Sequence, residues 1–149
     1  MLLVPESVPY KMKHLVIPTD FTNNSAKAFQ CAKTIQDQNQ SNLYALHVYN
    51  IPSVYFPYID RKKALDKTEK HLLDKYRLFL KKNKLENIPF DLVYHEELSV
   101  VGVIKKYAEE ESMDIVSARG GNRITSLFIG SITNELLSEN LSIPILVVK

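Results

Sequence analysis

Short apolar runs alternate with longer segments of helical periodicity along the whole chain. Apolar runs bounded by proline or polar residues predict strands, and apolar positions spaced three or four apart predict helices. Strands are expected at residues 14–20, 42–50, 88–96, 114–118 and 143–149. Helices are expected at about 24–40, 61–83, 98–113 and 131–140. This alternation predicts an α/β domain of three layers, an open, twisted, mainly parallel five-stranded sheet with helices on both faces.

The helical periodicity also predicts which side chains enter the core. In the first three helices these are Ala28, Cys31, Ala32, Ile35, Leu65, Leu72, Tyr76, Phe79, Val100, Val103 and Ile104. The domain is expected to span residues 14–149. Residues 1–13 have no clear pattern and are assigned as an N-terminal tail, which either is flexible or covers a sheet edge.

Composition and charge narrow the range of functions. The net charge is only +2, although residues 61–84 carry ten Lys or Arg against three acids. A basic helix face is usually only a solvated face, and no DNA-reading motif accompanies it, so no nucleic-acid partner is expected. Cys31 is the single cysteine, which excludes an intramolecular disulfide. No signal-peptide pattern or run of membrane-spanning length occurs, so we expect a cytoplasmic protein with no membrane partner.

Residues 117–131 hold three of the chain's four glycines. Neither the dinucleotide-binding fingerprint nor the P-loop pattern occurs there. Gly130 stands at the expected start of a helix, where the N–H groups of Ser131, Ile132 and Thr133 would face an anion at the positive end of the helix dipole. The alternative is an ordinary helix cap after a tight turn at Gly120 and Gly121.

Three segments reach across nearly the whole chain: "HLVIPTDFTNNSAKAFQCA", "LHVYN" and "ARGGNRITSLFIGSITNELLSENLSIPILVVK". Through them the chain resembles the universal stress protein (UspA-like) family. The ATP-binding branch of that family carries G-x2-G-x9-G-[ST], and this chain has Ser117, Gly120 and then Gly130-Ser131 at that spacing. The resemblance implies a Rossmann-like sheet of order 3-2-1-4-5 and a bound ATP, with Mg²⁺ held through the phosphates.

The resemblance also assigns parts of the nucleotide to residues of this chain. Pro18, Thr19 and Asp20 would line the adenosine side, and the backbone of Val48 would bond adenine. The phosphates would be surrounded by Gly120, Gly130, Ser131 and Thr133. Arg119 either adds charge there or is a solvated loop cation, and Asp20 could equally end its strand through an Asx-turn.

Ser117 departs from the motif, because it stands where the ATP-binding branch has its first glycine. A positive φ at this position would turn its side chain against the ligand, whereas an extended backbone would leave room.

We expect a binding and signalling module rather than a catalyst, with at most weak ATP hydrolysis. The four histidines are scattered along the sequence, and the paired carboxylates lack the opposed arrangement of an acid–base pair. The competing hypothesis is a nucleotide-free, dimeric regulatory protein of the same family. In either case the apolar strand at Pro144 to Lys149 predicts a homodimer, because an apolar edge strand needs a partner.

Overall fold

The computed structural model describes residues 1–6, 12–96, 98–118, 129–138 and 142–148. The strands are β1 (Leu2–Leu3), β2 (His14–Pro18), β3 (Asn42–Tyr49), β4 (Phe90–Tyr94), β5 (Asp114–Ala118) and β6 (Ile145–Val148). The helices are α1 (Asn23–Asn39), α2 (Arg61–Lys82), α3 (Val100–Glu110) and α4 (Ile129–Ser138), and a short 3-10 turn, η1 (Ser53–Tyr55), precedes α2.

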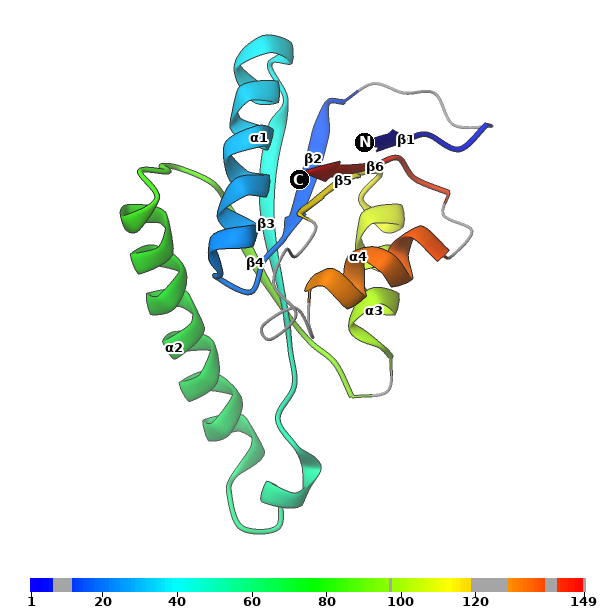
Figure 1. Ribbon diagram of the computed structural model, residues 1–149. Coiled ribbons are helices and arrows are strands. Elements are labelled where there is room, and N and C mark those ends of the chain that lie inside the picture. Colours follow the sequence, from blue (N-terminus) through cyan, green and yellow to red (C-terminus); the bar gives the residue numbers. More distant parts are fainter. Residues whose placement is uncertain (7–11, 97, 119–128, 139–141, 149) are drawn as a thin grey trace.

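The strands form one sheet in the order β1-β6-β5-β2-β3-β4. The five strands from β2 to β6 are mutually parallel, and their order is the 3-2-1-4-5 that the family resemblance implies. The expected count of five was wrong, because β1 adds a sixth strand that runs antiparallel to β6. Figure 1 shows β2 in the middle of the sheet, with the N- and C-terminal ends of the chain at the same edge.

The added strand changes the interpretation of the N-terminal residues. Leu2 pairs with Leu146 and Leu3 with Ile145, so these residues cover an edge, the second alternative left open by the sequence. Met1 and Val147 exchange two backbone hydrogen bonds of 2.8 Å. The outer edge of β6, through which a homodimer was expected, is therefore already paired within the chain.

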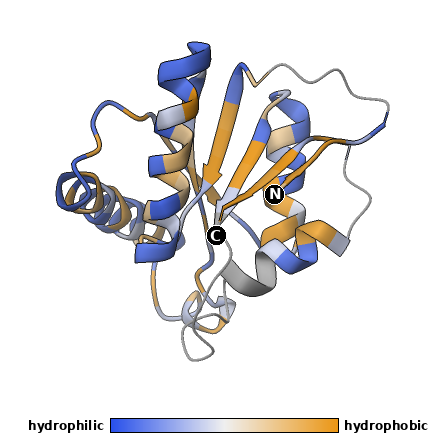
Figure 2. Cartoon of the chain, turned by 45° about the horizontal axis from the view of Figure 1, so that its top comes forward, coloured by the Kyte–Doolittle hydropathy of each residue, from blue (hydrophilic) through white to orange (hydrophobic). Residues whose placement is uncertain are grey.

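Two hydrophobic cores lie on opposite faces of the sheet. Buried side chains of α1 and α2 pack on one face and those of α3 and α4 on the other. β2 serves both cores, because Leu15 and Ile17 belong to the first, Val16 belongs to the second, and all three are fully buried. Figure 2 shows the sheet as the most hydrophobic part of the chain, as a sheet covered on both faces requires.

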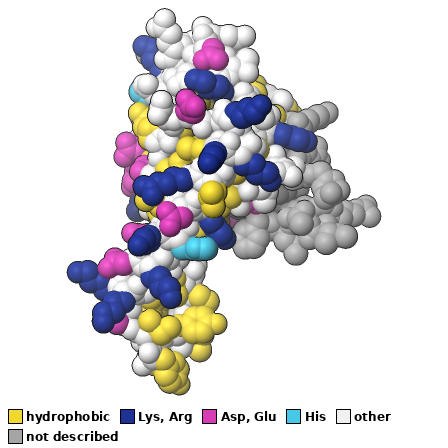
Figure 3. Space-filling model, turned by 90° about the vertical axis from the view of Figure 1, so that its left-hand side faces the viewer, with side chains coloured by type: hydrophobic (Ala, Val, Ile, Leu, Met, Phe, Trp, Pro, Cys, Tyr) yellow, Lys and Arg dark blue, Asp and Glu magenta, His cyan; other side chains and the backbone are white. Residues whose placement is uncertain are grey.

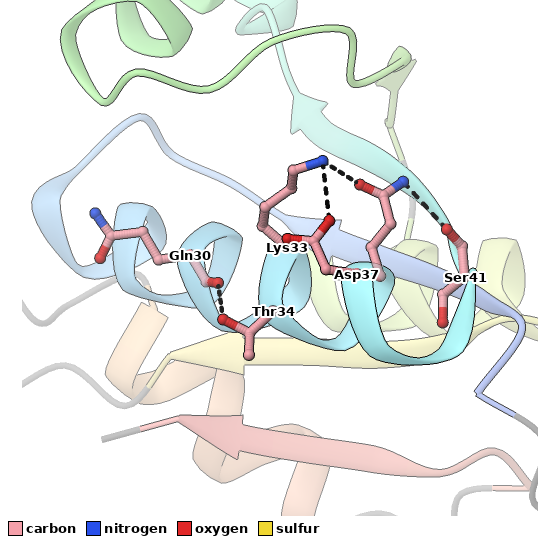
Figure 4. Close-up of polar contacts among 6 residues, drawn as sticks. Gln30, Lys33, Thr34, Asp37 and Ser41 are labelled. Atoms are coloured by element: carbon pink, nitrogen blue, oxygen red, sulfur yellow. Dashed lines mark hydrogen bonds and ion pairs between the residues drawn. The ribbon is translucent and has the colours of Figure 1, made fainter.

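Helix α1 is fixed at both ends by local hydrogen bonds. Thr22 caps its start by accepting a bond from the backbone N–H of Ser25. At its end Gln40 adopts a left-handed conformation, and the Gln36 side chain donates to the carbonyl oxygen of Ser41 (3.1 Å), directly before β3. Figure 4 shows this contact together with the other polar contacts of the exposed face, including the Lys33–Asp37 ion pair (3.5 Å). The exposed ion pair contributes little, whereas the capped ends determine where β3 begins.

The predicted core faces are largely confirmed. Ala28, Ala32, Leu72, Tyr76, Phe79, Val103 and Ile104 are buried, whereas Cys31, Ile35, Leu65 and Val100 are only partly buried. The sequence analysis missed Phe29, which is fully buried on α1 with its ring 5.2 Å from that of Phe79. Phe29 thereby joins α1 to α2 above the sheet.

We predict that Phe29→Ala lowers the free energy of unfolding by about 3–5 kcal/mol, because the lost ring leaves a cavity between two helices and the sheet. Urea denaturation followed by circular dichroism measures this change. Tyr58→Ala is the matched control, because the Tyr58 side chain is exposed, and its effect should stay within about 0.5 kcal/mol. Equal effects of the two variants would contradict the assigned core.

Candidate functional site

The carboxyl ends of β2 and β5 define the place where a ligand is expected. The chain leaves β2 toward β3 on one side, and β5 lies on the other side of β2, so the strand order reverses between them. Ligands of open α/β sheets bind outside the carboxyl ends of the strands at such a reversal. Thr19 and Asp20 follow β2 here, and Ser117 lies at the end of β5.

The residues that follow β2 are held by a compact hydrogen-bond network. Thr19 is buried, and its hydroxyl donates to Ser25 Oγ (3.2 Å) and accepts from the N–H of Phe21 (3.1 Å). Asp20 Oδ1 accepts from the N–H (3.0 Å) and the hydroxyl (2.6 Å) of Thr22. The Asx-turn interpretation of Asp20 is therefore found in the structure, and one carboxylate oxygen is committed to the start of α1.

The backbone N–H and C=O groups of Val48 face the space just beyond the carboxyl end of β2. Leu46 accepts a bond from the N–H of Thr19 (2.9 Å), so the backbone groups of Leu46 face β2. Directions alternate along a strand, so the N–H and C=O groups of Val48, two residues later, face the same way. The ladder between β2 and β3 ends at Pro18 and Leu46, and the backbone of Val48 therefore extends beyond the last β2 pair.

His47 lies beside Val48 and is held in one tautomer. Its Nδ1 is 2.7 Å from the carbonyl oxygen of Thr19, and a carbonyl only accepts, so Nδ1 carries the proton. The ring of Phe21 covers it at 4.7 Å between centroids. Burial lowers the pKa of His47 below its ordinary 6.5, and Lys75 lowers it further, against the opposing effects of the Thr19 bond and Asp20.

Phe21 reaches this position through a left-handed backbone conformation, with φ at 65°. Such a φ is uncommon for an aromatic residue and costs of order 1–3 kcal/mol. The ring also packs edge-on against Phe79 (6.1 Å) and Phe90 (6.0 Å). These contacts offset the cost and turn the chain sharply at the end of β2.

Ser117 and Thr133 form the contact between β5 and α4. Both are buried, and their hydroxyl oxygens are 2.8 Å apart. Ser117 pairs with Val147 within the sheet and is not among the residues of positive φ. The backbone at the departure from the glycine motif is thus extended, and the serine hydroxyl points at Thr133.

The remaining motif residues divide into two groups. Gly130, Ser131 and Ile132 lie in the first turn of α4, which contains no acidic residue. Arg119 and Gly120 lie outside the described residues. Three parts of the predicted site are described by the structure: the end of β2, the end of β5 and the first turn of α4.

Metal-binding and membrane-spanning features are absent from the described parts of the chain. No group of three or more His, Cys, Asp or Glu residues within them could hold a metal ion. None of the helices described here combines the length and apolar character that crossing a bilayer demands.

Comparison with known families identifies the domain. A model of the universal stress protein family matches residues 11–149, which is nearly the whole chain. The chain belongs to the universal stress protein family. A search of curated protein sequences gives no significant match.

Solved structures agree with the family assignment at the level of the fold. The hypothetical protein MJ0577 is 20% identical with a TM-score of 0.71, over 94% of this chain and 97% of the other. UspA from Lactobacillus plantarum is 20% identical with a TM-score of 0.69, over 95% and 100% of the two chains. A universal stress protein in complex with cAMP is 17% identical with a TM-score of 0.60, over 92% and 96%.

Two residues near this universal stress protein's site were not predicted from the sequence. His47 was classed with the scattered histidines, and Phe21 received no role. His47 could have been singled out because it directly precedes Val48, a predicted site residue, on the same strand. Its bond to Thr19, however, depends on how β2 and β3 are aligned. Sequence periodicity does not contain that alignment.

We predict that His47 makes the protein less stable as the pH falls below about 6.5, where the unfolded chain binds a proton that the folded chain takes up only at lower pH. The free energy of unfolding should fall by at most about 1.4 kcal/mol per pH unit from this group. Urea denaturation at pH 7.5 and 5.5 measures the slope. His47→Gln keeps a donor for the Thr19 carbonyl and should reduce the slope of the free energy of unfolding against pH. His71→Gln, at an exposed position, should leave that slope unchanged. Identical slopes in the parent protein and both variants would refute the assignment.

Proposed function

We propose that this protein binds ATP or another adenine nucleotide at the carboxyl ends of β2, β3 and β5, and serves as a stress-response or signalling module. The observation that carries the proposal is the position of the motif. Ser117 is the next-to-last residue of β5 and Gly130 lies in the first turn of α4, so both belong to the β5 side of the strand-order reversal at β2. Family membership and the cAMP-bound relative of the same fold support an adenine-containing ligand.

The adenosine side would be formed by the ends of β2 and β3. The N–H and C=O groups of Val48 project past the last pair of β2 and can match the donor and acceptor on the edge of an adenine ring. Pro18, Thr19 and Asp20 border the same space. Because Asp20 Oδ1 is used by Thr22, Oδ2 is the oxygen we assign to a ribose hydroxyl.

The phosphate side would be formed by the first turn of α4. Free N–H groups at a helix start attract phosphate oxygens, and the first turn of α4 holds no acidic residue that would oppose them. Gly130 allows close approach, while Ser131 and Ile132 supply N–H groups. Arg119 and Gly120 keep the roles that the family resemblance gives them, and Mg²⁺ would be held through the phosphate oxygens.

Ser117 and Thr133 would position this helix rather than touch the ligand. The Thr133 side chain is fully buried and shares a 2.8 Å bond with Ser117, so its hydroxyl is directed into the protein. The bond ties α4 to β5 and sets where the first turn of α4 lies. Serine in place of the motif's first glycine is thus compatible with an open phosphate site, because its side chain points inward.

The second candidate is a nucleotide-free regulatory protein of the same family. The observation that favours it is the same Ser117–Thr133 bond, since it commits two motif hydroxyls to the interior. We assign no catalytic residue in either case, because the described site lacks an activated nucleophile beside a base.

Isothermal titration calorimetry with ATP, ADP, AMP and cAMP tests the proposal. We expect at least one of them to bind, and Gly130→Ala to weaken that binding about tenfold or more by crowding the phosphates. Gly102→Ala is the matched control, because it makes the same change in the first turn of a different helix, α3, to which no part of the nucleotide is assigned. The absence of binding heat at millimolar concentrations of all four nucleotides would leave the nucleotide-free candidate.

We also propose that the protein is a homodimer at the β1 edge of the sheet. With the outer side of β6 taken by β1, the edge expected to pair is that of β1, where Leu2 and Leu3 are each 42% exposed. Burying such an apolar edge against its symmetry mate would stabilise a dimer.

Sedimentation velocity tests the dimer. Leu3→Asp should shift the protein toward the monomer, since it places a charge in the proposed interface. Leu78→Asp, on the exposed side of α2, is the matched control and should leave the association unchanged. A monomeric parent protein at concentrations of about 100 μM would rule the interface out.

A further inference from the structure

The segment between β3 and α2 presents an unusual set of exposed apolar side chains. Val54, Tyr55, Tyr58 and Ile59 are 66%, 53%, 87% and 48% exposed. We call these four residues the apolar tip. They lie around η1, which projects beyond the lower end of the sheet in Figure 1. Apolar side chains gathered at one exposed place usually mark a binding surface.

The base of the apolar tip is held firmly by the rest of the protein. The guanidinium of Arg61 lies 5.2 Å from the ring centroid of Phe56 and 5.7 Å from that of Tyr94, and it pairs with Glu96. The hydroxyl of Tyr49 donates to Glu69 of α2 (2.6 Å). The side chains of the apolar tip are therefore exposed although the base of the loop that carries them is fixed to the rest of the protein.

Positive charge follows directly behind the apolar tip. Lys62, Lys63, Lys67 and Lys70 lie in the first three turns of α2, and no ion pair engages them in the described part of the chain. Asp60 is directed at the start of the helix, where it accepts from the N–H of Lys63 (2.9 Å). Asp66 and Glu69 lie in the same turns, but residues 61–70 still carry five Lys or Arg against these two acids. The lysines thus keep their charge available to a partner.

A groove joins the apolar and basic groups into one surface. Its volume is about 400 Å³, and Tyr55 and Ile59 of the apolar tip line it together with Lys63 and Lys67. Figure 3 shows hydrophobic side chains collected at the lower end of the molecule, with Lys and Arg side chains over the adjoining α2. The two kinds of side chain can therefore act on the same partner.

We propose that the apolar tip and these lysines form a peripheral docking surface for an anionic lipid bilayer. Tyrosine, valine and isoleucine would enter the boundary between headgroups and acyl chains, and the ammonium groups would contact the lipid phosphates. The projecting position favours a bilayer over a protein groove, because the extreme end of a molecule reaches a flat surface without obstruction. No membrane partner was expected because the sequence has no run of membrane-spanning length. A peripheral contact does not require such a run.

Vesicle binding by the full chain tests the proposal. The chain contains no tryptophan, so Tyr58→Trp introduces a single reporter at the apolar tip. We expect its emission to shift to shorter wavelength with phosphatidylcholine vesicles containing about 30% phosphatidylserine and to stay unchanged with pure phosphatidylcholine. Co-sedimentation should show binding that falls about tenfold or more in Lys62→Glu/Lys63→Glu and in Val54→Ser/Tyr58→Ser.

Two matched variants on the far part of α2 provide the controls. Lys81→Glu/Lys82→Glu makes the same change of charge in the last turn, and Leu78→Ser removes an apolar side chain that is as exposed as Val54. Both should bind vesicles within about twofold of the parent protein. The proposal is overturned if anionic vesicles bind nothing, if the controls weaken binding as much as the tip variants, or if the tip variants abolish self-association instead.

Discussion

Burial of both faces of β2 is the constraint on which the rest of the structure depends. Leu15, Val16 and Ile17 are fully buried and point alternately into the two cores. A strand in this position must have a neighbour on each side and a helical layer on each face. The neighbours of β2 in the sheet are β3 on one side and β5 on the other, so the strand order reverses at β2, and ligands of open α/β sheets bind outside the carboxyl ends of the strands at such a reversal.

The end of β2 is fixed from three directions. Asp20 and Thr22 organise the start of α1, the Thr19 carbonyl holds His47, and the ring of Phe21 is inserted among the aromatic side chains near α2. Each contact joins β2 to a different neighbour. An adenine nucleotide bound here would meet a surface whose backbone is already in place, so little of its binding energy would be needed to order the protein.

Hydrophobic periodicity was enough to predict the central fold. β5 was expected at the residues where it is found, because its apolar pair Ile115 and Val116 lies between the polar residues Asp114 and Ser117. β1 was not predicted, because a strand of two residues is too short for alternation to appear. Phe29 was missed because the apolar positions of α1 were assigned to a single narrow face, whereas α1 packs against both the sheet and α2.

The candidate site could be predicted only where it depends on the order of residues along the chain. The positions of Gly130 and Ser131 at the start of a helix follow from sequence. The Ser117–Thr133 bond and the tautomer of His47 depend on strand and helix placement, so neither could be read from spacing alone. Both concern hydroxyl or ring groups whose partners are distant in sequence.

The antiparallel pairing of β1 with β6 brings the two ends of the chain together. Met1 is hydrogen-bonded to Val147 in both directions, so a linker of a few residues could join them and the chain could be opened elsewhere as a circular permutant. A fluorescent protein fused at either end would stand beside the same sheet edge and obstruct it. Labels for imaging are better carried by the far part of α2.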